Sequence, residues 1–296
     1  MIPAQNRPPA AALWLPAACL TLNAFVWGVS WWPLRQLQQM GLHPLWATVL
    51  IYALAVVVIS LWRPAAWGQL LRTRSLWPLV LAAGLTNATF NWAVTIGDVV
   101  RVVLLFYLMP LWAVLLARWL LHEALTPAAG VRVLLALSGA GIVLWPESGG
   151  LPLPRTLAEF LAVLGGFSFA LNNVMLRREA HQPAPARALA MFVGGVAVAG
   201  SLALLLSVGA QLPWPPTPAP DWILTCLALG LVFLVGNIAL QYGAARLPAN
   251  VTAVVMITEV VFAAGSAVLW GVGVLSLPLL VGGLLIVSAS LLSAWR

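Results

Sequence analysis

The stretch "NWAVTIGDVVRVVLLFYLMPLWAVLLARWLLHEALTP", residues 91–127, consists of two apolar runs joined by a short polar break. The run 99–120 carries charge only at Arg101 and Arg118, close to its two ends. A helix needs about 20 predominantly apolar residues to cross the hydrocarbon core of a membrane. The stretch therefore predicts the end of one membrane span and the whole of the next.

The rest of the chain has the same apolar character. Of its 296 residues, 62% are hydrophobic and 7% are charged, whereas soluble domains have roughly 25% charged residues. The net charge of +7 comes from arginines scattered singly or in pairs between apolar runs, unlike the clustered basic face of a nucleic-acid-binding protein. We therefore expect an integral membrane protein without a nucleic-acid partner.

The same length criterion, with Pro, Gly and Arg clusters as breaks, predicts ten spans joined by short connections. This makes the fold an all-α integral membrane protein of ten transmembrane helices, with no extramembrane domain. The spans are approximately 13–32, 44–62, 76–96, 99–120, 127–145, 156–177, 187–208, 221–242, 248–270 and 277–295.

Arginine and tryptophan placement agree with these spans. With the amino terminus inside, eleven arginines fall on the inner side, and only Arg35, Arg101 and Arg155 fall on the other. Cytoplasmic loops carry such an excess of basic residues. Thirteen of the 16 tryptophans lie near predicted span ends, as in an interfacial aromatic belt. Both termini are thus predicted to be cytoplasmic, with the protein in the inner (plasma) membrane of a bacterial cell.

The second half of the chain weakly repeats the first. A shift of 150 residues lays "TNATFNWAV" (86–94) on "GNIALQYGA" (236–244), and a shift of 142 lays "WGVSWWPLR" (27–35) on "FALNNVMLR" (169–177). We therefore predict two five-helix repeats, 1–148 and 149–296. Because five is odd, the second repeat must have inverted topology, which is common among secondary transporters with a substrate site near the midplane.

At these residues the chain resembles the drug/metabolite transporter superfamily, specifically its ten-helix EamA-type exporters, of which the aromatic amino acid exporters are one kind. The resemblance is carried by "WGVSW" (27–31) and by 91–127, where Pro110, Glu123 and Thr126 occupy the "P…gE.lt" pattern. The second half departs from it, with Val260 in place of the proline. The resemblance implies export of amino acids, related metabolites or amphipathic cations, driven by an ion gradient or by exchange.

Polar and aromatic residues at helical spacing within the spans suggest a binding cavity, because polar side chains in spans usually face the bundle interior. Residues three, four or seven positions apart share one helix face. The candidate substrate-binding residues are Trp27, Trp31, Asn87, Asn91, Trp92, Arg101, Tyr107, Asn172, Asn173, Asn237, Gln241 and Tyr242.

These residues have two interpretations. Amides could line a central cavity, since they donate to a carboxylate and accept from an ammonium, while Trp and Tyr rings bind cations or stack. Alternatively, the amides bond one helix to another. Arg101 is likewise either the partner of Asp98 in an i,i+3 ion pair or a carboxylate anchor at the outer mouth, with the aromatic pair Phe106–Tyr107 deeper along the same helix.

Glu259 stands alone in the apolar run of the ninth span, on one stripe with Thr252 and Ser266. A shift of 150 places it on Met109, so the carboxyl breaks the symmetry of the two halves. It is our candidate for proton coupling or for contact with a cation. The alternative is that it only bonds to a neighbouring helix.

The predicted function is a secondary active transporter that exports small amphipathic metabolites, above all amino acids, aromatic and hydrophobic ones included. It would work by alternating access at a midplane cavity, with proton coupling or exchange. One alternative is a multidrug or quaternary-cation exporter, and another is a lipid flippase or a membrane-embedded enzyme. Because the polar residues in the spans are mainly amides and the histidines and cysteines lack metal-ligand spacing, we expect no enzyme activity, no cofactor and no metal. The partners would be a small-molecule substrate and membrane lipid.

Overall fold

The structure, a computed structural model, describes residues 14–120, 127–145, 153–244, 246–247 and 255–294. Within these ranges the regular structure is helical and there is no strand. The elements are α1 (Trp14–Val29), α2 (Trp31–Gln39), α3 (Pro44–Trp62), α4 (Ala65–Arg72), the 3-10 turn η2 (Arg74–Leu76), α5 (Trp77–Ile96), α6 (Val99–Phe106), α7 (Met109–Leu120), α8 (Pro127–Val143), α9 (Leu157–Arg178), α10 (Ala184–Val208), α11 (Pro220–Ala244), α13 (Thr258–Leu269) and α14 (Leu277–Ala294).

Six helical segments of the described chain are long and apolar enough to cross a membrane. They correspond to the predicted spans two, three, four, six, seven and eight. α8, α13 and α14 contribute shorter apolar helices, and the predicted first span is divided between α1 and α2. The all-α membrane architecture is thus confirmed, whereas the count of ten spans stays a prediction. The six segments are Pro44–Trp62, Arg74–Ile96, Val99–Leu120, Leu157–Arg178, Ala184–Val208 and Pro220–Leu240.

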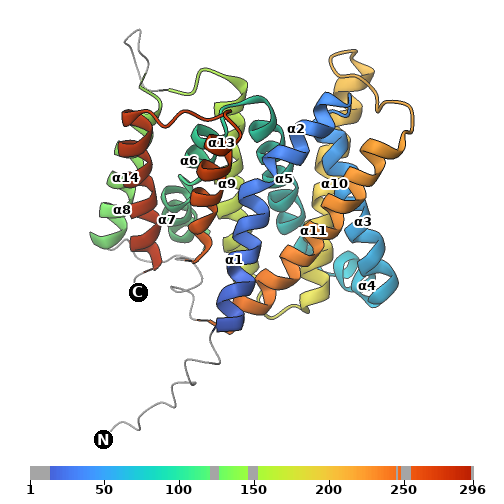
Figure 1. Cartoon of the computed structure of the whole chain (residues 1–296). Helices are drawn as coiled ribbons and strands as arrows, with labels where there is room; N and C mark the ends of the chain where they lie inside the picture. Colours follow the sequence, from blue (N-terminus) through green and yellow to red (C-terminus); the bar gives the residue numbers. More distant parts are fainter. Residues whose placement is uncertain (1–13, 121–126, 146–152, 245, 248–254, 295–296) are drawn as a thin grey trace, which may run out of the picture.

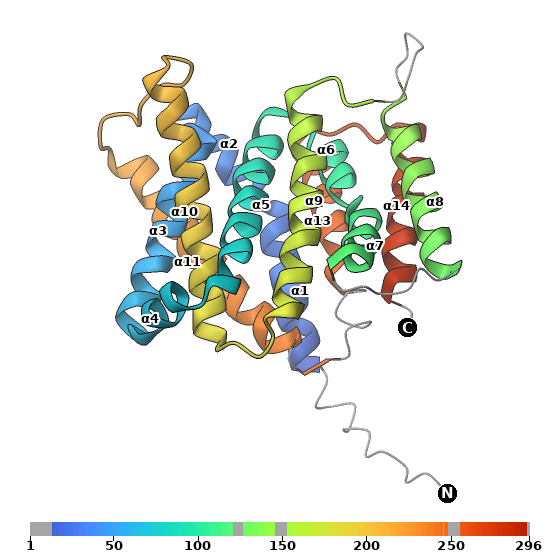
Figure 2. The ribbon, with the colours of Figure 1, turned by 180° about the vertical axis from the view of Figure 1, so that it is seen from behind.

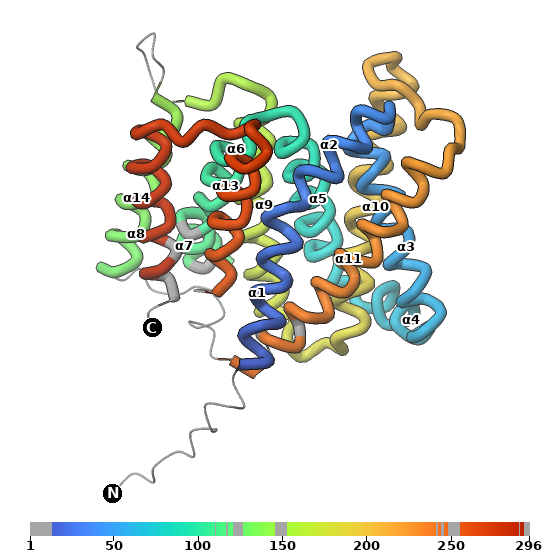
Figure 3. The backbone as a smooth tube through the Cα atoms, viewed as in Figure 1, coloured from blue at the N-terminus to red at the C-terminus, as the bar shows by residue number. Residues whose placement is uncertain are grey.

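The helices stand side by side in a bundle (Figure 1). α5 packs against α9 and α10, and the three lie next to one another when the bundle is seen from behind (Figure 2). At one edge α8 packs against α14, and at the other α3 packs against α10. The start of α1 and the end of α14 lie toward the same end of the bundle, the lower one in Figure 3. We call this the terminal end and the other the opposite end.

The packing partners follow the predicted internal repeat. In the predicted repeat, α11 is the counterpart of α5 and α1 is the counterpart of α9. α5 packs on α9, and their counterparts α11 and α1 also pack on each other. In the same way α10 packs on α5, and α3 packs on α11. Helices that pack together thus have counterparts in the other half that also pack together. The boundary between 1–148 and 149–296 itself stays a prediction.

α5 and α10 approach each other backbone to backbone at Gly84 and Gly194. A Cβ on Gly194 would overlap the carbonyl oxygen of Val80, and a Cβ on Gly84 would overlap the carbonyl oxygen of Gly194. Small residues permit such close crossings between membrane helices. The two glycines therefore fix the contact between a helix of the first half and one of the second.

Two of the apolar segments are interrupted just before a proline. The breaks fall at Ser30, between α1 and α2, and at Tyr107 and Leu108, between α6 and α7. A proline has no amide hydrogen for the carbonyl four residues earlier. The carbonyls concerned are those of Val29, for Pro33, and Phe106, for Pro110.

Candidate functional site

Two interrupted segments, one from each half, meet inside the bundle. Tyr107 lies in the turn between α6 and α7, and Ile257 lies in the turn just before α13. The shift of 150 residues that aligns the halves places Tyr107 on Ile257, so the two breaks are at equivalent positions. α6 and α13 pack against each other. Interrupted helices at corresponding positions of two repeats are a common setting for the substrate site of secondary transporters.

The break before α13 forms without a proline. The amide of Val260 donates to the carbonyl of Ile257 at 3.0 Å, instead of to Met256 four residues back. The hydroxyl of Thr258 donates to the carbonyl of Val255 at 2.6 Å. The carbonyl of Met256 is thereby left for a partner from outside the helix, and it accepts from Tyr107 Oη at 3.1 Å.

Glu259 lies next to this break, in the first turn of α13. Its Oε2 is 3.1 Å from Tyr107 Oη, and both residues are buried, with 7% and 3% of their surface exposed. The positive end of the helix dipole favours an acidic group in the first turn. The structure therefore brings together Tyr107 and Glu259, two residues that the sequence singled out separately.

The hydrogen bonds of Tyr107 depend on the protonation of Glu259. A phenol has one hydrogen to donate, but Tyr107 Oη has two oxygen partners at 3.1 Å. If Glu259 is ionised, one of the two oxygens receives no hydrogen. If Glu259 carries a proton, it can donate to Tyr107 Oη, whose own hydrogen then goes to the carbonyl of Met256. Both contacts are full hydrogen bonds only when the carboxyl group is protonated.

A row of aromatic rings leads from Tyr107 to α1. Trp27 is stacked on Phe233, with centroids 4.7 Å apart and an interplanar angle of 18°, and it meets Phe90 at 6.1 Å. Phe90 lies 4.7 Å from Phe106, which lies 6.2 Å from the ring of Tyr107. Sequence analysis predicted Trp27 and the Phe106–Tyr107 pair but missed Phe90 and Phe233, because a Phe in an apolar span has no pattern that separates a ligand contact from lipid or helix packing.

α9 packs against the α6–α7 break from the side opposite α13. The carbonyl of Phe106, which receives no hydrogen from Pro110, lies so close to Gly166 that a Cβ there would overlap its oxygen. Phe169, one turn further along α9, has its ring 5.3 Å from that of Phe106. The α6–α7 break is thus held against a helix of the second half.

The amides of the third predicted span tie α5 to α3. Asn87 accepts from Tyr52 Oη at 2.6 Å, and Asn91 donates to Thr48 Oγ1 at 3.0 Å. The Oδ1 atom of Asn91 is buried and has no hydrogen-bond partner among the described residues. These contacts are those of the helix-bonding interpretation, and the structure does not place the two amides beside Tyr107 and Glu259.

The predicted residues of the second half are more dispersed. Asn172 is 2% exposed, with an Oδ1 atom that has no hydrogen-bond partner in the described chain. Asn173 is exposed on the outside of α9, and Asn237 is half-buried in α11. The side chain of Gln241 lies outside the described part of the structure, as do Glu123, Thr126 and Thr252.

The other predicted aromatic residues lie at three separate places. Trp31 is buried and donates from Nε1 to Ser266 Oγ at 2.9 Å, which joins α2 to α13. Trp92 packs edge-on against the His43 ring at 5.1 Å, near the start of α3. The ring of Tyr242 lies 3.7 Å below the guanidinium of Arg246 at the last turn of α11. Of the three, only Trp31 lies next to the helix that carries Glu259.

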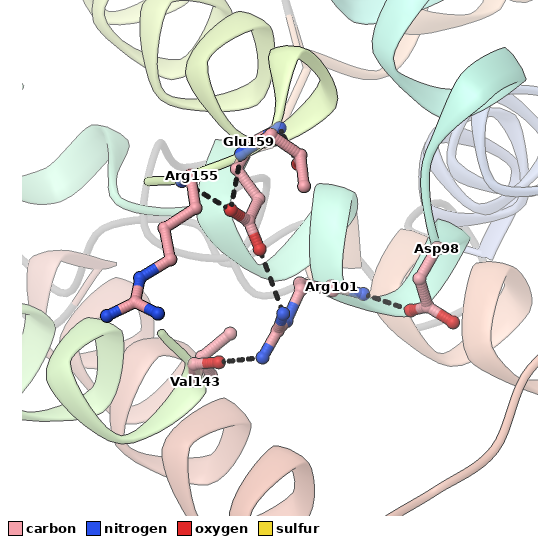
Figure 4. Close-up of polar contacts among 6 residues, drawn as sticks. Asp98, Arg101, Val143, Arg155 and Glu159 are labelled. Atoms are coloured by element: carbon pink, nitrogen blue, oxygen red, sulfur yellow. Dashed lines mark hydrogen bonds and ion pairs between the residues drawn. The ribbon is translucent and has the colours of Figure 1, made fainter. Parts of the chain in front are cut away.

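Arg101 joins three helices at the opposite end of the bundle (Figure 4). Its guanidinium donates to Glu159 Oε1 at 2.8 Å and to the carbonyl of Val143 at 2.6 Å. Its contact with Asp98 is made by the backbone amide, at 2.8 Å, because Asp98 caps the start of α6. The expected i,i+3 ion pair with Asp98 is therefore wrong, and Glu159 of α9 is the actual partner.

Glu159 is held in place by the start of its own helix. Its Oε2 accepts from the backbone amides of Arg155 at 2.8 Å and Thr156 at 3.1 Å, as Figure 4 shows for Arg155. Thr156 in turn caps the amide of Glu159, which completes a capping box. Because Arg101 is already bound to Glu159, a substrate carboxylate would have to displace an ion pair here. The role of Arg101 as an anchor stays a prediction.

No group of three or more His, Cys, Asp and Glu side chains in the described ranges could hold a metal ion. The expectation that the protein works without metal or cofactor stays a prediction. The groups that the structure brings together at the site are the carboxyl of Glu259, the phenol of Tyr107, the carbonyl of Met256 and the aromatic rings.

Comparison with known proteins adds a family and a fold. Residues 14–145 match the model of the EamA-like transporter family. Of the solved structures, 15 chains match. One of them, a crystal structure described only as that of a protein, covers 93% of this chain and 96% of its own, with 20% sequence identity and a TM-score of 0.54. At this identity the likeness concerns the fold alone. No curated protein matches the chain.

The family match includes Trp27, the α6–α7 break and Tyr107, and it agrees with the multi-pass helical architecture. Members of this family are membrane transporters of the drug/metabolite type. Residues 14–145, a little under half of the chain, thus match a family of the drug/metabolite transporter superfamily, which is the superfamily that the sequence resembles.

Proposed function

We propose that this transporter is a secondary active exporter of small amphipathic metabolites that carry an amino group and an apolar or aromatic part, amino acids first among them. The observation that supports it is the contact of Tyr107 with Glu259 between two interrupted helices, one from each half. Alternating access would expose this contact first to one side of the membrane and then to the other.

The amino group of the substrate is the part that Glu259 would bind. A carboxyl group within the membrane is costly and marks substrate or proton pathways, and an ammonium is its natural partner in a charge-assisted hydrogen bond. The rings of Trp27, Phe90 and Phe106 offer faces and edges to the apolar part. Asn87 and Asn91 are engaged with α3, so they are poorer candidates for the substrate's polar groups.

Proton and substrate would compete for the same carboxyl group. The protonated Glu259 satisfies Tyr107 and, through it, the carbonyl of Met256. An ammonium can pair with Glu259 only after that proton has left, and Tyr107 must then choose between two acceptors. Binding of substrate would therefore release a proton and weaken one link between the two interrupted helices. Exchange of protons for substrate follows from this competition.

The test is a flux assay in proteoliposomes with a panel of amino acids and amphipathic amines at two pH values. We expect an imposed proton gradient to drive accumulation of at least one amine-bearing compound. Glu259→Gln should abolish this pH-driven accumulation, because the neutral amide cannot exchange a proton. Absence of flux for every amino acid and amine would refute the proposed function, and an unchanged pH dependence in Glu259→Gln would refute the coupling.

The matched control is Glu179→Gln. Glu179 is also buried, at 2% exposed, but it lies at the terminal end, where it accepts from Ser75 Oγ at 2.6 Å. This variant should keep the pH-driven flux. Loss of flux in both variants would mean that removing any buried carboxyl damages the protein.

A second candidate, an exporter of quaternary cations, is favoured by the ring of Trp27 and its neighbours around one acid. Aromatic faces and a carboxylate are the groups that recognise quaternary ammonium ions. Such a cation has no proton to donate to Glu259, so it requires only the charge and the rings. Competition by zwitterionic amino acids but not by quaternary cations would reject this candidate.

A further inference from the structure

An apolar groove of ≈ 670 Å³ lies where α1 and α2 meet α11 and α13. α1 lies between α13 and α11 on the face of the bundle turned to the viewer in Figure 1. Sites for small molecules have volumes of about 300–1,000 Å³. None of the described residues that line the groove is charged, and the lining includes Phe25, Trp31, Trp32, Phe262, Ser266 and Trp270.

The mouth of this groove faces the hydrocarbon of the membrane. Phe25, Val261 and Leu269 line it and are 46%, 67% and 82% exposed, and all three belong to predicted spans. At its upper rim the rings of Trp32 and Trp270 lie 6.1 Å apart, and such tryptophans mark the level of the lipid headgroups. A molecule in the groove would therefore come from the bilayer and not from bulk water.

Trp31 and Ser266 both line the groove and are joined by a hydrogen bond from Trp31 Nε1 to Ser266 Oγ at 2.9 Å. Ser266 lies two turns after Glu259 on the same face of α13, and Trp31 lies one turn after Trp27. The chain is interrupted between those two tryptophans, at Ser30, where Pro33 leaves the carbonyl of Val29 without its helical donor. Between the groove and Glu259, α1 lies directly against α13: a Cβ on Gly28 would overlap the carbonyl oxygen of Glu259 and the Cβ of Phe262. The groove therefore borders the region of the proposed site along the α1–α13 contact, next to the break at Ser30.

We propose that this groove is a lateral entrance, through which the apolar part of a membrane-dissolved amphipathic amine enters before its amino group reaches Glu259. The inference rests on the proposed function and adds the substrate class: amines with an apolar chain long enough to partition into the bilayer. Separation of α1 from α13, which breaks the Trp31–Ser266 bond, admits the amine. A short, water-soluble amine gains nothing from an uncharged route through hydrocarbon and does not use it.

Gly265 allows the groove to be filled without disturbing the helices. It lines the groove in α13, and a Cβ there would meet no atom within 4 Å. Gly265→Leu and Gly265→Trp should lower the flux of a long-chain primary amine in proteoliposomes by about tenfold, and leave the flux of its short-chain homologue unchanged. Gly141→Leu is the control, because Gly141 of α8 is equally open and remote from the groove. Equal flux of the long-chain amine in all variants would overturn the proposal.

A second experiment measures the occupancy of the groove and does not depend on transport. Cys19 and Cys226 are replaced by alanine, a bimane fluorophore is attached to Gly265→Cys, and the vesicles contain lipids with brominated acyl chains. We expect the bromines to quench the fluorophore and the long-chain amine, but not the short one, to relieve the quenching. Absence of quenching would mean a groove closed to the bilayer, and quenching that no amine relieves would mean a groove for lipid only. Either result overturns the entrance.

The two proposals fail in different ways. If the unmodified protein transports no amine of either length, the proposed function fails, while relief of quenching still tests whether amines bind in the groove. If both amines are transported equally well in Gly265→Trp, the function stands and the entrance fails.

Discussion

The phenol oxygen of Tyr107 lies 3.1 Å from a carboxyl oxygen of Glu259, although the two residues are 152 positions apart in the chain. The contact joins the α6–α7 break to the first turn of α13. It connects the predicted halves at the point where neither has a continuous helix. Forming or breaking this one contact therefore affects the conformation of both halves.

Replacing Tyr107 by Phe should impair transport far more than stability. The ring contacts with Phe106 remain, but Glu259 and the carbonyl of Met256 lose their common partner, at a cost of about 1–3 kcal/mol for a buried unsatisfied polar group. We expect pH-driven flux to fall by at least about tenfold in a variant that still purifies as a folded protein. Flux and thermal unfolding in detergent would be measured together.

Tyr242→Phe is the control for that variant. The ring of Tyr242 lies under Arg246, and a phenyl ring keeps this contact. Its flux should match that of the unmodified protein. A loss of flux in Tyr242→Phe would instead support the predicted role of Tyr242 in binding substrate.

The ion pair of Arg101 with Glu159 should contribute a small, measurable coupling. Arg101 is 39% exposed and Glu159 is 7% exposed, so solvent weakens the attraction. A double-mutant cycle with Arg101→Gln and Glu159→Gln should give a coupling energy of about 0.5–1 kcal/mol in unfolding experiments. Strictly additive effects of the two substitutions would show that the pair contributes nothing to stability.

A methyl group at Gly194 should destabilise the α5–α10 crossing. The added Cβ would overlap the carbonyl oxygen of Val80, and overpacking of this kind costs about 1–3 kcal/mol. Gly194→Ala should therefore lower Tm by several degrees. Gly200→Ala in the same helix meets only Val49 Cγ2 at 3.5 Å, an ordinary contact, and should leave Tm unchanged or raise it. Equal Tm values for the two variants would contradict the crossing.

His43 should make the stability of the protein fall in acid. Burial lowers the pKa of His43 from 6.5 to about 4, and its Nδ1 accepts from the amide of Leu45 at 3.2 Å, which caps α3. A lowered pKa means that the folded state binds fewer protons than the unfolded state. The contribution of His43 to the free energy of unfolding is therefore complete above pH 6.5. It is lost between pH 6.5 and 4, by at most about 1.4 kcal/mol per pH unit.

His43→Asn separates this effect from other titrations. Asparagine is a good N-cap residue and does not titrate, so Tm of the variant should vary less between pH 7 and pH 5 than Tm of the unmodified protein. Parallel pH profiles of the two proteins would show that His43 does not titrate in this range.

The apolar runs predicted the helices well because the membrane imposes their length. The runs 44–62, 99–120 and 156–177 agree within a few residues with helical segments of the structure. The breaks within the spans were not predicted. Pro110 was interpreted as part of a family pattern and not as an interruption, and the break at Ile257 has no proline at all. It depends on Thr258 and Tyr107 taking carbonyls that a continuous helix would use, which is a tertiary effect.

The candidate site was predicted in part. Helical spacing shows which residues share a face of one helix, but not which neighbour that face meets. Asn87 and Asn91 were correctly placed on one face, and the structure shows that this face meets Tyr52 and Thr48 of α3. Glu259 could be singled out because a lone charge in an apolar span is rare, whereas the phenylalanines around Tyr107 carry no such signal.

The two breaks differ in permanence. Pro110 has no amide hydrogen for the carbonyl of Phe106, so the break between α6 and α7 is present in every conformation. At Ile257 every amide hydrogen is present, and Val260 needs only to turn from Ile257 back to Met256 when Tyr107 lets that carbonyl go. Where the two halves meet, one break is thus permanent and the other can become continuous helix, so the two halves, however alike in fold, should move unequally.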